Sequence, residues 1–186
     1  MTKLQRLEQL KKKVEQDKNL PFIEEATTLV FGEGSENPKV LFIGEAPGKN
    51  EDLTGRPFIG AAGKTLSELI TSIGLTREEV YITSVIQYRP PKNRDPKPQE
   101  IALFEPYLDE QINILNPKII VTLGRFSLSK FLPNSKIADQ HGKPTQLNWQ
   151  ELDFTIIPMY HPAAIIYNQK LKQTLKDDFQ IIKQYL

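Results

Sequence analysis

Apolar residues recur along this chain with two different spacings, and each spacing predicts one kind of secondary structure. Leu4, Leu7, Leu10 and Val14 follow the helical period, so residues 2–16 are expected to form an amphipathic helix. Short, nearly continuous apolar runs are typical of buried parallel strands, and they occupy residues 39–44, 80–85, 118–124 and 154–159. Further helical patterns cover residues 66–74, 101–115, 126–132 and 171–186.

Strands and helices alternate along the chain, which predicts the α/β class: a three-layer α/β/α sandwich around a central four-stranded, mainly parallel sheet. No internal repeat, low-complexity segment or linker interrupts the sequence, so residues 1–186 are expected to form a single domain. In folds of this kind, ligands bind at the carboxyl ends of the strands. Those ends carry residues 44–45, 85–89, 124–125 and 160–161, where the side chains most suited to chemistry lie.

Composition narrows the class of protein. A hydrophobic fraction of 39% and a charged fraction of 25% exclude an intrinsically disordered chain, and 24 basic against 23 acidic residues exclude a strongly cationic one. A local basic patch is still compatible with that balance. No apolar run reaches the roughly 18 residues of a membrane-spanning helix, and the charged residues 1–17 contain no signal segment. The chain has no cysteine, which excludes disulfides and thiolate ligands and favours a cytoplasmic location.

Two acidic residues, Glu45 and Glu51, lie in the loop GEAPGKNED that follows the first predicted strand. Gly44 and Gly48 permit a tight turn there, and Pro47 stiffens it. Both carboxylates can therefore face one small cavity, where they could bind or orient a water molecule. Solvated loop acids are the ordinary alternative for this segment.

Two rings stand out because of where they lie. Phe58 is in the glycine-flanked loop GRPFIG at residues 55–60, off any periodic face, and it could stack against a flat ligand ring. His161 follows the last predicted strand and precedes Pro162, which favours an extended backbone and displays the imidazole at the end of the sheet. An ordinary packing role is the alternative for both. His141 is expected on the surface and is assigned no role.

Residues 89–97, RPPKNRDPK, carry four cations and one acid in a segment stiffened by prolines. Such a loop is suited to contacting phosphates, with a solvated loop as the alternative. The segment GAAGKT at residues 60–65 suggests a phosphate-binding P-loop, but the required first glycine is replaced by Phe58. A helix start with Lys64 on the surface is expected instead. Together, these features favour a flat, uncharged ring bound beside a polyanion, as when a base is taken out of a nucleic acid.

Several segments, in order along residues 17–170, closely resemble the family 4 uracil-DNA glycosylases. The matching segments are VFGEG at residues 30–34, GEAPGKNED, GRPFIGAAGKTLSELI, VYITSVIQYRPPKNRDPKPQEI and MYHPAAII. The resemblance implies a monofunctional enzyme of base excision repair that flips deoxyuridine out of single- or double-stranded DNA. It would hydrolyse the bond between uracil and deoxyribose and leave an abasic site. A monomer that contacts no membrane is expected.

The resemblance also assigns roles to individual residues. The catalytic residues that it implies are Glu45, Glu51, Asn93 and His161. The base-binding residues that it implies are Gly44, Ala46, Phe58 and Ser84. The DNA-binding residues expected are Arg89, Lys92, Arg94, Pro162, Ala163 and Tyr167.

In this scheme, Phe58 stacks on uracil, while Glu45 and Glu51 shape the pocket and position water. Asn93 would support these two acids. His161 would hydrogen-bond uracil O2 and stabilise the departing uracil anion. Residues 162–167 would form the loop that enters the minor groove.

The sequence departs from the family pattern at three places. Family members usually hold a [4Fe–4S] cluster with four cysteines, and those positions are Asp17, Leu20, Tyr88 and Phe104 here, so no cofactor is expected and packing should fill the site. Ser84 replaces the asparagine that reads uracil N3 and O4. Serine can donate and accept through one hydroxyl but is shorter, so weaker uracil binding or looser base choice is expected. Tyr167 stands where an arginine is common, and it could stack instead.

Three other functions compete with uracil excision. The first is a glycosylase for another deaminated base, such as hypoxanthine or xanthine. The second is a non-catalytic DNA-binding paralogue, against which the joint presence of Glu45, Glu51, Phe58, Asn93 and His161 argues. The third is a nucleotide-binding hydrolase, which the incomplete P-loop disfavours.

Overall fold

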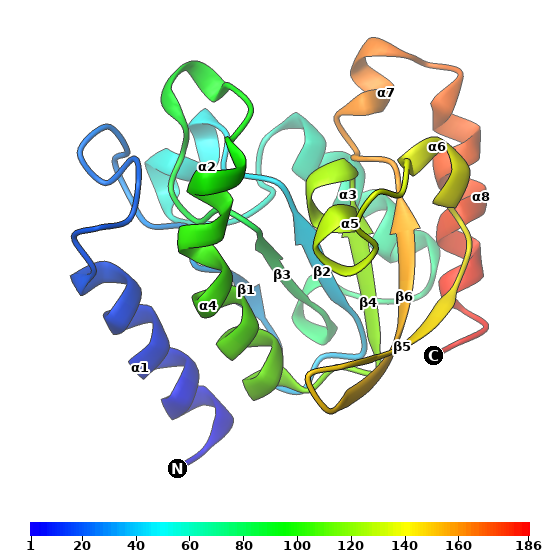
Figure 1. Cartoon of the computed structure of the whole chain (residues 1–186). Helices are drawn as coiled ribbons and strands as arrows, with labels where there is room; N and C mark the ends of the chain where they lie inside the picture. Colours follow the sequence, from blue (N-terminus) through cyan, green and yellow to red (C-terminus); the bar gives the residue numbers. More distant parts are fainter.

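The computed structural model describes residues 1–186 and has a six-stranded sheet with helices on both faces (Figure 1). The strands are β1 Glu33–Gly34, β2 Leu41–Gly44, β3 Tyr81–Ser84, β4 Ile119–Leu123, β5 Thr145–Trp149 and β6 Leu152–Met159. Their order is β1-β3-β2-β4-β6-β5, in which β3, β2, β4 and β6 run parallel and the two edge strands pair antiparallel. The mainly parallel sheet is confirmed, but the predicted count of four strands is wrong. The two extra strands lie at the edges and lack a continuous apolar run, since β1 has two residues and β5 alternates in burial.

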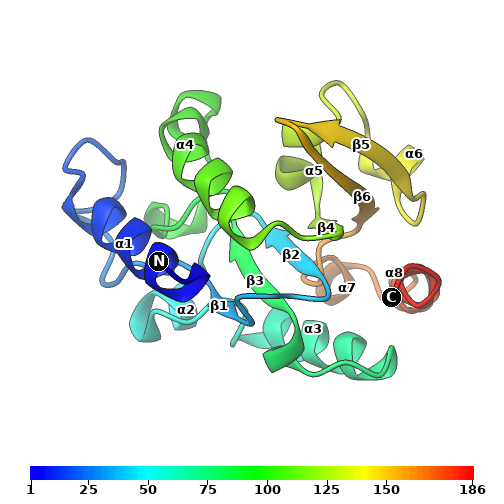
Figure 2. The same cartoon turned by 90° about the horizontal axis from the view of Figure 1, so that it is seen from below.

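The helices form the outer two layers. They are α1 Lys3–Gln16, α2 Lys49–Thr54, α3 Ala61–Ser72, α4 Pro98–Leu115, α5 Arg125–Phe131, α6 Ile137–Gln140, α7 Ala164–Tyr167 and α8 Leu171–Ile182, with 3₁₀ turns η1 Arg77–Glu79 and η2 Pro91–Asn93. Helices α1, α4 and α5 cover one face of the sheet, and α3 and α8 cover the other (Figure 2). This arrangement confirms the three-layer sandwich. None of the helices is long and apolar enough to cross a lipid bilayer.

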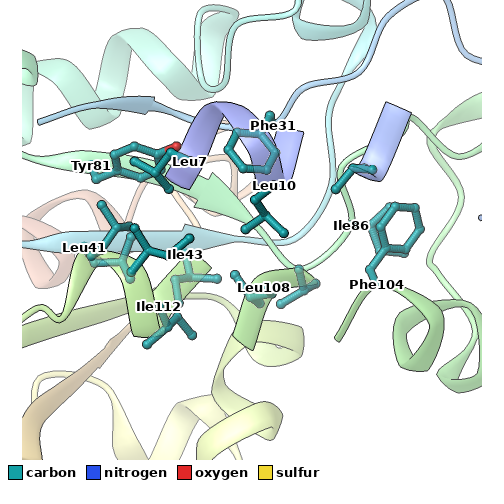
Figure 3. Close-up of a cluster of buried hydrophobic side chains, with 14 of the residues drawn as sticks. Leu7, Leu10, Phe31, Leu41, Ile43, Tyr81, Ile86, Phe104, Leu108 and Ile112 are labelled. Atoms are coloured by element: carbon teal, nitrogen blue, oxygen red, sulfur yellow. The ribbon is translucent and has the colours of Figure 1, made fainter. Parts of the chain in front are cut away.

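The first hydrophobic core lies between the sheet and helices α1 and α4 (Figure 3). Leu7 and Leu10 of α1 pack there, whereas Leu4 is exposed, so the apolar stripe predicted for this helix is shorter than expected. A capping box starts α1, because the Thr2 hydroxyl accepts from the Gln5 N–H while the Gln5 side chain accepts from the Thr2 N–H.

This core also contains three of the four positions at which the resemblance places cluster cysteines. Leu20, Tyr88 and Phe104 are all buried in it, and the Tyr88 and Phe104 ring centroids are 6.3 Å apart. The fourth position, Asp17, caps the end of α1, and its Oδ2 accepts a hydrogen bond of 2.7 Å from the Tyr107 hydroxyl. The packing predicted for these positions is therefore confirmed.

The second core lies on the opposite face, under α3 and α8. Phe42 of β2 and Phe179 of α8 stack there nearly parallel, with ring centroids 5.9 Å apart. Helix α8 ends at Ile182, so Leu186, which the sequence pattern included in the helix, is exposed. As expected, α3 begins directly after Gly60 and its Lys64 is exposed, so GAAGKT is a helix start.

Because the four parallel strands point the same way, the loops that follow them gather at one edge of the sheet, at the top of Figure 1. The register aligns Gly44 at the end of β2 with Ser84 at the end of β3. The pairing continues past both strands, since Val85 donates its N–H to the Gly44 carbonyl at 3.1 Å. The loops that carry the predicted site residues are thus anchored to one rigid edge.

Candidate active site

A cavity of about 490 Å³ lies at this edge. It is bounded by the segments that follow β2 and β6, by the loop between α2 and α3, and by the segment that joins β3 to α4. The predicted site residues that line it are Glu45, Ala46, Glu51, Phe58, Ser84, Asn93, Arg94, His161, Ala163 and Tyr167. The predicted residues outside its lining are Gly44, Arg89, Lys92 and Pro162. The structure thus brings together residues separated by more than 100 positions in sequence.

Phe58 and His161 form one wall of the cavity. Their ring centroids are 5.5 Å apart and their planes are inclined by 31°. Phe58 is only 8% exposed, so the same ring belongs to the second hydrophobic core and to the cavity lining. Gly44 lies against this ring, because a Cβ at that position would come within 2.5 Å of it. Glycine is therefore required at the end of β2 for Phe58 to occupy its place.

Ser84 reaches the cavity beside Gly44. It is 4% exposed, and its Oγ lies 3.3 Å from the position of a Cβ on Gly44. No protein group forms a hydrogen bond with this hydroxyl. A polar atom that lines a cavity and lacks a protein partner is available to a ligand.

The two acids of the first loop have different environments. Glu51 Oε1 accepts hydrogen bonds from the backbone N–H groups of Ile59 at 2.9 Å and Gly60 at 2.8 Å. Burial raises the pKa of Glu45, the charge of Asp95 adds to this effect, and Arg125 opposes it. Glu51 thus holds the loop after Phe58 in place. The Glu45 carboxyl, by contrast, accepts no hydrogen bond from a backbone N–H group.

His161 is held in one tautomer. The backbone N–H of Ala163 donates to its Nδ1 at 3.1 Å, so the proton of the neutral ring lies on Nε2. Burial lowers the pKa of His161 to about 4, although the charge of Glu51 acts in the opposite direction. At neutral pH the ring is therefore an uncharged hydrogen-bond donor facing the cavity.

The basic loop is more constrained than its sequence indicates. Arg89 donates from Nε to Asn93 Oδ1 at 2.7 Å and lies 3.9 Å from Asp52. Asn93 thus contacts Arg89 rather than Glu45 or Glu51, which it was expected to support.

Another cation of this loop is also engaged within the protein. Arg94 forms a two-pronged ion pair with Glu100, at 2.8 and 2.6 Å, and its guanidinium lies over the Phe22 ring at 5.1 Å. Lys92 is exposed and enters no ion pair. The positive charge that this loop can offer to a phosphate is therefore smaller than its four cationic residues suggest.

The segment after His161 forms the rim of the cavity. The His161 carbonyl accepts from the Ala164 N–H at 2.8 Å, and α7 follows directly. Tyr167, the last residue of α7, is 89% exposed and lines the cavity mouth. Pro162 is buried beneath this segment. An exposed aromatic side chain is thus held beside the opening by a short helical turn.

Sequence reasoning missed the pairing of His141. This residue was expected on the surface, but it is half-buried, with Nδ1 2.8 Å from Asp178 Oδ2 and its ring 4.8 Å from that of Tyr160. Burial raises the pKa of Asp178, and the hydrogen bond from His141 lowers it. Tyr160 directly precedes His161, so this pair supports the chain beneath the site. No local signal could have indicated it, because α8 packs there only in the folded chain.

The residues do not fit an iron–sulfur cluster. The chain has no cysteine, and no group of three or more histidine, cysteine, aspartate or glutamate side chains is placed to hold a metal ion. At the positions that the resemblance assigns to the cluster, Leu20 and Phe104 offer no ligand atom and the Asp17 carboxylate is engaged by Tyr107.

The fold and the cavity define an α/β protein in which an aromatic side chain and a neutral histidine lie side by side on one wall of a cavity at the edge of the sheet. The family model of the uracil DNA glycosylase superfamily matches residues 31–185. A type-4 uracil-DNA glycosylase of Sulfurisphaera tokodaii is 46% identical over 184 residues, which cover 96% of this chain and 84% of that protein.

Two further relatives are nearly as similar. Type-4 uracil-DNA glycosylases of Saccharolobus solfataricus and Archaeoglobus fulgidus are 44% and 43% identical, over 84% of this chain in each case and 76% and 81% of those proteins. The chain therefore belongs to the uracil-DNA glycosylase superfamily and, within it, to the type-4 family.

Proposed function

We propose that this protein is a uracil-DNA glycosylase of base excision repair, which hydrolyses the bond between uracil and deoxyribose in DNA and leaves an abasic site. The observation that carries the proposal is the pairing of a stacking ring with a neutral donor, Phe58 and His161, on one wall of a cavity large enough for a base. The names of the type-4 relatives support the same activity.

The geometry suits a reaction in which the leaving group is an anion. With uracil stacked on Phe58, the Nε2–H of His161 donates to uracil O2 and stabilises the negative charge that develops as the C1′–N1 bond breaks. The electron pair of that bond stays with uracil. A neutral imidazole serves here because it stabilises the anion without giving up its proton. Uracil then takes a proton from solvent.

Glu45 acts on the sugar. Its carboxylate orients a water molecule, and its negative charge stabilises the positive charge that develops at C1′. The water oxygen bonds to C1′ as the base departs, and its proton passes to Glu45 and then to solvent. Glu51 contributes by holding the loop that carries Phe58, through the N–H groups of Ile59 and Gly60.

Ser84 determines which bases the pocket recognises. Its hydroxyl faces the edge of the base and can donate or accept, so it recognises uracil less strictly than a side-chain amide, which does both at once. Gly44 and Ala46 form part of the boundary of this base pocket. The free hydroxyl of Ser84 is the one observation that favours a second candidate function, excision of another deaminated base such as hypoxanthine or xanthine.

The partner is DNA, bound at the rim of the cavity. Tyr167, with Ala163 beside it, enters the minor groove and fills the gap left by the flipped nucleotide, while the buried Pro162 supports this segment from beneath. Lys92 contacts a phosphate, while Arg89 and Arg94 shape the basic loop and add positive charge. We propose that the 186 residues work as one catalytic domain, as a monomer and without a metal cluster.

The test is excision from oligonucleotides. Single- and double-stranded DNA with one uracil is incubated with the protein and then treated with alkali, beside strands carrying hypoxanthine, xanthine or thymine. Cleavage at uracil is expected, with a loss of at least about 100-fold in rate for His161→Ala and Glu45→Ala while DNA binding persists. Lys64→Ala, in the incomplete P-loop, is the matched control and should cleave like the parent.

Other outcomes distinguish the alternatives. Cleavage at hypoxanthine or xanthine alone would show that the enzyme prefers another deaminated base and would leave the proposed mechanism unchanged. DNA binding without cleavage at any base, persisting in Ser84→Asn, would contradict the enzyme and favour a binding protein. Nucleotide binding lost in Lys64→Ala would favour a hydrolase.

A further inference from the structure

The loop that carries Phe58 has a backbone conformation that phenylalanine rarely adopts. Phe58 has φ of +50°, in the left-handed region that favours glycine. A conformation of this kind persists only where neighbouring groups determine it. The neighbours of Phe58 therefore decide where its ring lies.

One such neighbour is Arg77, in the turn η1. Its Nη1 donates to the carbonyl of Phe58 at 3.0 Å, and its Nη2 donates to the carbonyl of Pro57 at 2.8 Å. Nη2 also pairs with Glu33 Oε1 at 2.7 Å, and Nη1 lies 3.3 Å from the hydroxyl of Ser67. The side chain is 19% exposed, and Arg77 does not line the cavity. Any effect of Arg77 on a bound ligand must therefore pass through the loop.

The other side of the loop is held by an acid. Glu51 accepts from the N–H groups of Ile59 and Gly60, directly after Phe58. Helix α3 packs directly against the loop, because a Cβ on Gly63 would lie only 1.9 Å from the Phe58 carbonyl oxygen. A guanidinium on the carbonyl side and a carboxylate on the amide side thus enclose the strained residue.

We propose that Arg77 is a positioning residue for the base pocket, which fixes the plane of the Phe58 ring through the carbonyls of Pro57 and Phe58. This inference rests on the proposed function, in which Phe58 stacks on uracil. The planar guanidinium binds two successive carbonyls and Glu33 at once, which the single charged nitrogen of a lysine cannot do in the same geometry. Without Arg77, two half-buried carbonyls lose their donor and the left-handed conformation relaxes.

The chain offers a matched control in Arg56. It pairs with the same acid, Glu33, at 2.8 and 3.2 Å, but it is exposed and donates to neither loop carbonyl. Replacing Arg56 therefore removes an ion pair of Glu33 and leaves the two carbonyl bonds in place. Replacing Arg77 removes both kinds of interaction.

The experiment measures the inhibition constant of free uracil, together with kcat and KM for excision from a single-stranded oligonucleotide and the unfolding temperature. Arg77→Gln should raise the inhibition constant and KM by about tenfold, and Arg56→Gln should leave both unchanged. Arg77→Lys keeps a positive charge opposite Glu33, so this variant should unfold close to the parent temperature. It should nevertheless bind uracil more weakly than the parent, as Arg77→Gln does. If Arg77→Gln fails to fold, the comparison of Arg77→Lys with Arg56→Gln decides the question.

A double-mutant cycle separates positioning from a general structural effect. In a Phe58→Ala background, Arg77→Gln should weaken uracil binding no further, because the ring through which it acts is gone. An equal weakening in both backgrounds, or an unchanged inhibition constant in Arg77→Gln or Arg77→Lys, would overturn the inference alone. A parent protein that neither excises uracil nor is inhibited by it would overturn the proposed function, and this inference with it.

Discussion

The backbone N–H of Ala163 donates to Nδ1 of His161 at 3.1 Å, and this contact decides where the histidine carries its proton. Because Nδ1 is an acceptor, the neutral ring presents Nε2–H to the cavity. The same ring, packed beside Phe58, is costly to charge. Both effects keep His161 neutral over the pH range in which a repair enzyme works.

A histidine that its surroundings keep neutral makes the stability of the fold depend on pH in a defined direction. Burial lowers the pKa of His161 from 6.5 to about 4, so the unfolded chain binds this proton more readily than the folded chain does. Below pH 6.5 His161 therefore costs stability, and the cost rises as the pH falls, to about 3 kcal/mol near pH 4. Urea unfolding at several pH values should show a shallower acid loss in His161→Asn than in the parent. Parallel curves for the two proteins would contradict the assignment.

The rate of excision should depend on pH through a different residue. Burial raises the pKa of Glu45 above its ordinary value of 4.5, and the proposed mechanism needs its carboxylate ionised. The single-turnover rate should therefore fall as pH decreases through a pKa above 4.5, while His161 is still neutral. Glu45→Gln should be slow at every pH and should lack this acid limb. An acid limb that persists in Glu45→Gln would assign it to another group.

Ser84 is expected to limit the affinity for uracil. Ser84→Asn adds an amide that donates and accepts at once, so it should lower the inhibition constant of free uracil by about tenfold and narrow the range of bases excised. Ser84→Ala removes the hydroxyl and should raise the constant. Weaker uracil binding in Ser84→Asn, at an unchanged unfolding temperature, would show that the hydroxyl is already the better partner.

The packed site around Phe104 should carry much of the stability of the first core. Phe104 is 1% exposed against Tyr88, and Phe104→Ala is expected to lower the free energy of unfolding by about 3–5 kcal/mol. The matched control is Leu103→Ala on the same helix, where the side chain is 47% exposed and the change should stay within about 0.5 kcal/mol. Urea unfolding compares the two, and similar losses in both would show that the Phe104 site is loosely packed.

The sequence by itself determined the central architecture. The four parallel strands are nearly continuous apolar runs, and such runs are visible without the fold because burial on both faces leaves few polar positions. It also placed the cavity, since parallel strands end at a common edge and Glu45, Ser84 and His161 follow or close those strands.

Only the tertiary structure decided which polar groups meet. Arg77 binds the Phe58 carbonyl across 19 positions, and His141 pairs with Asp178 across 37 positions, yet none of these residues lies in a local pattern that indicates a partner. The edge strands β1 and β5 likewise depend on neighbours that fold against them. The physical reason is range: hydrophobic periodicity is a local property of the chain, whereas a hydrogen bond between distant segments exists only once packing has brought donor and acceptor within about 3 Å.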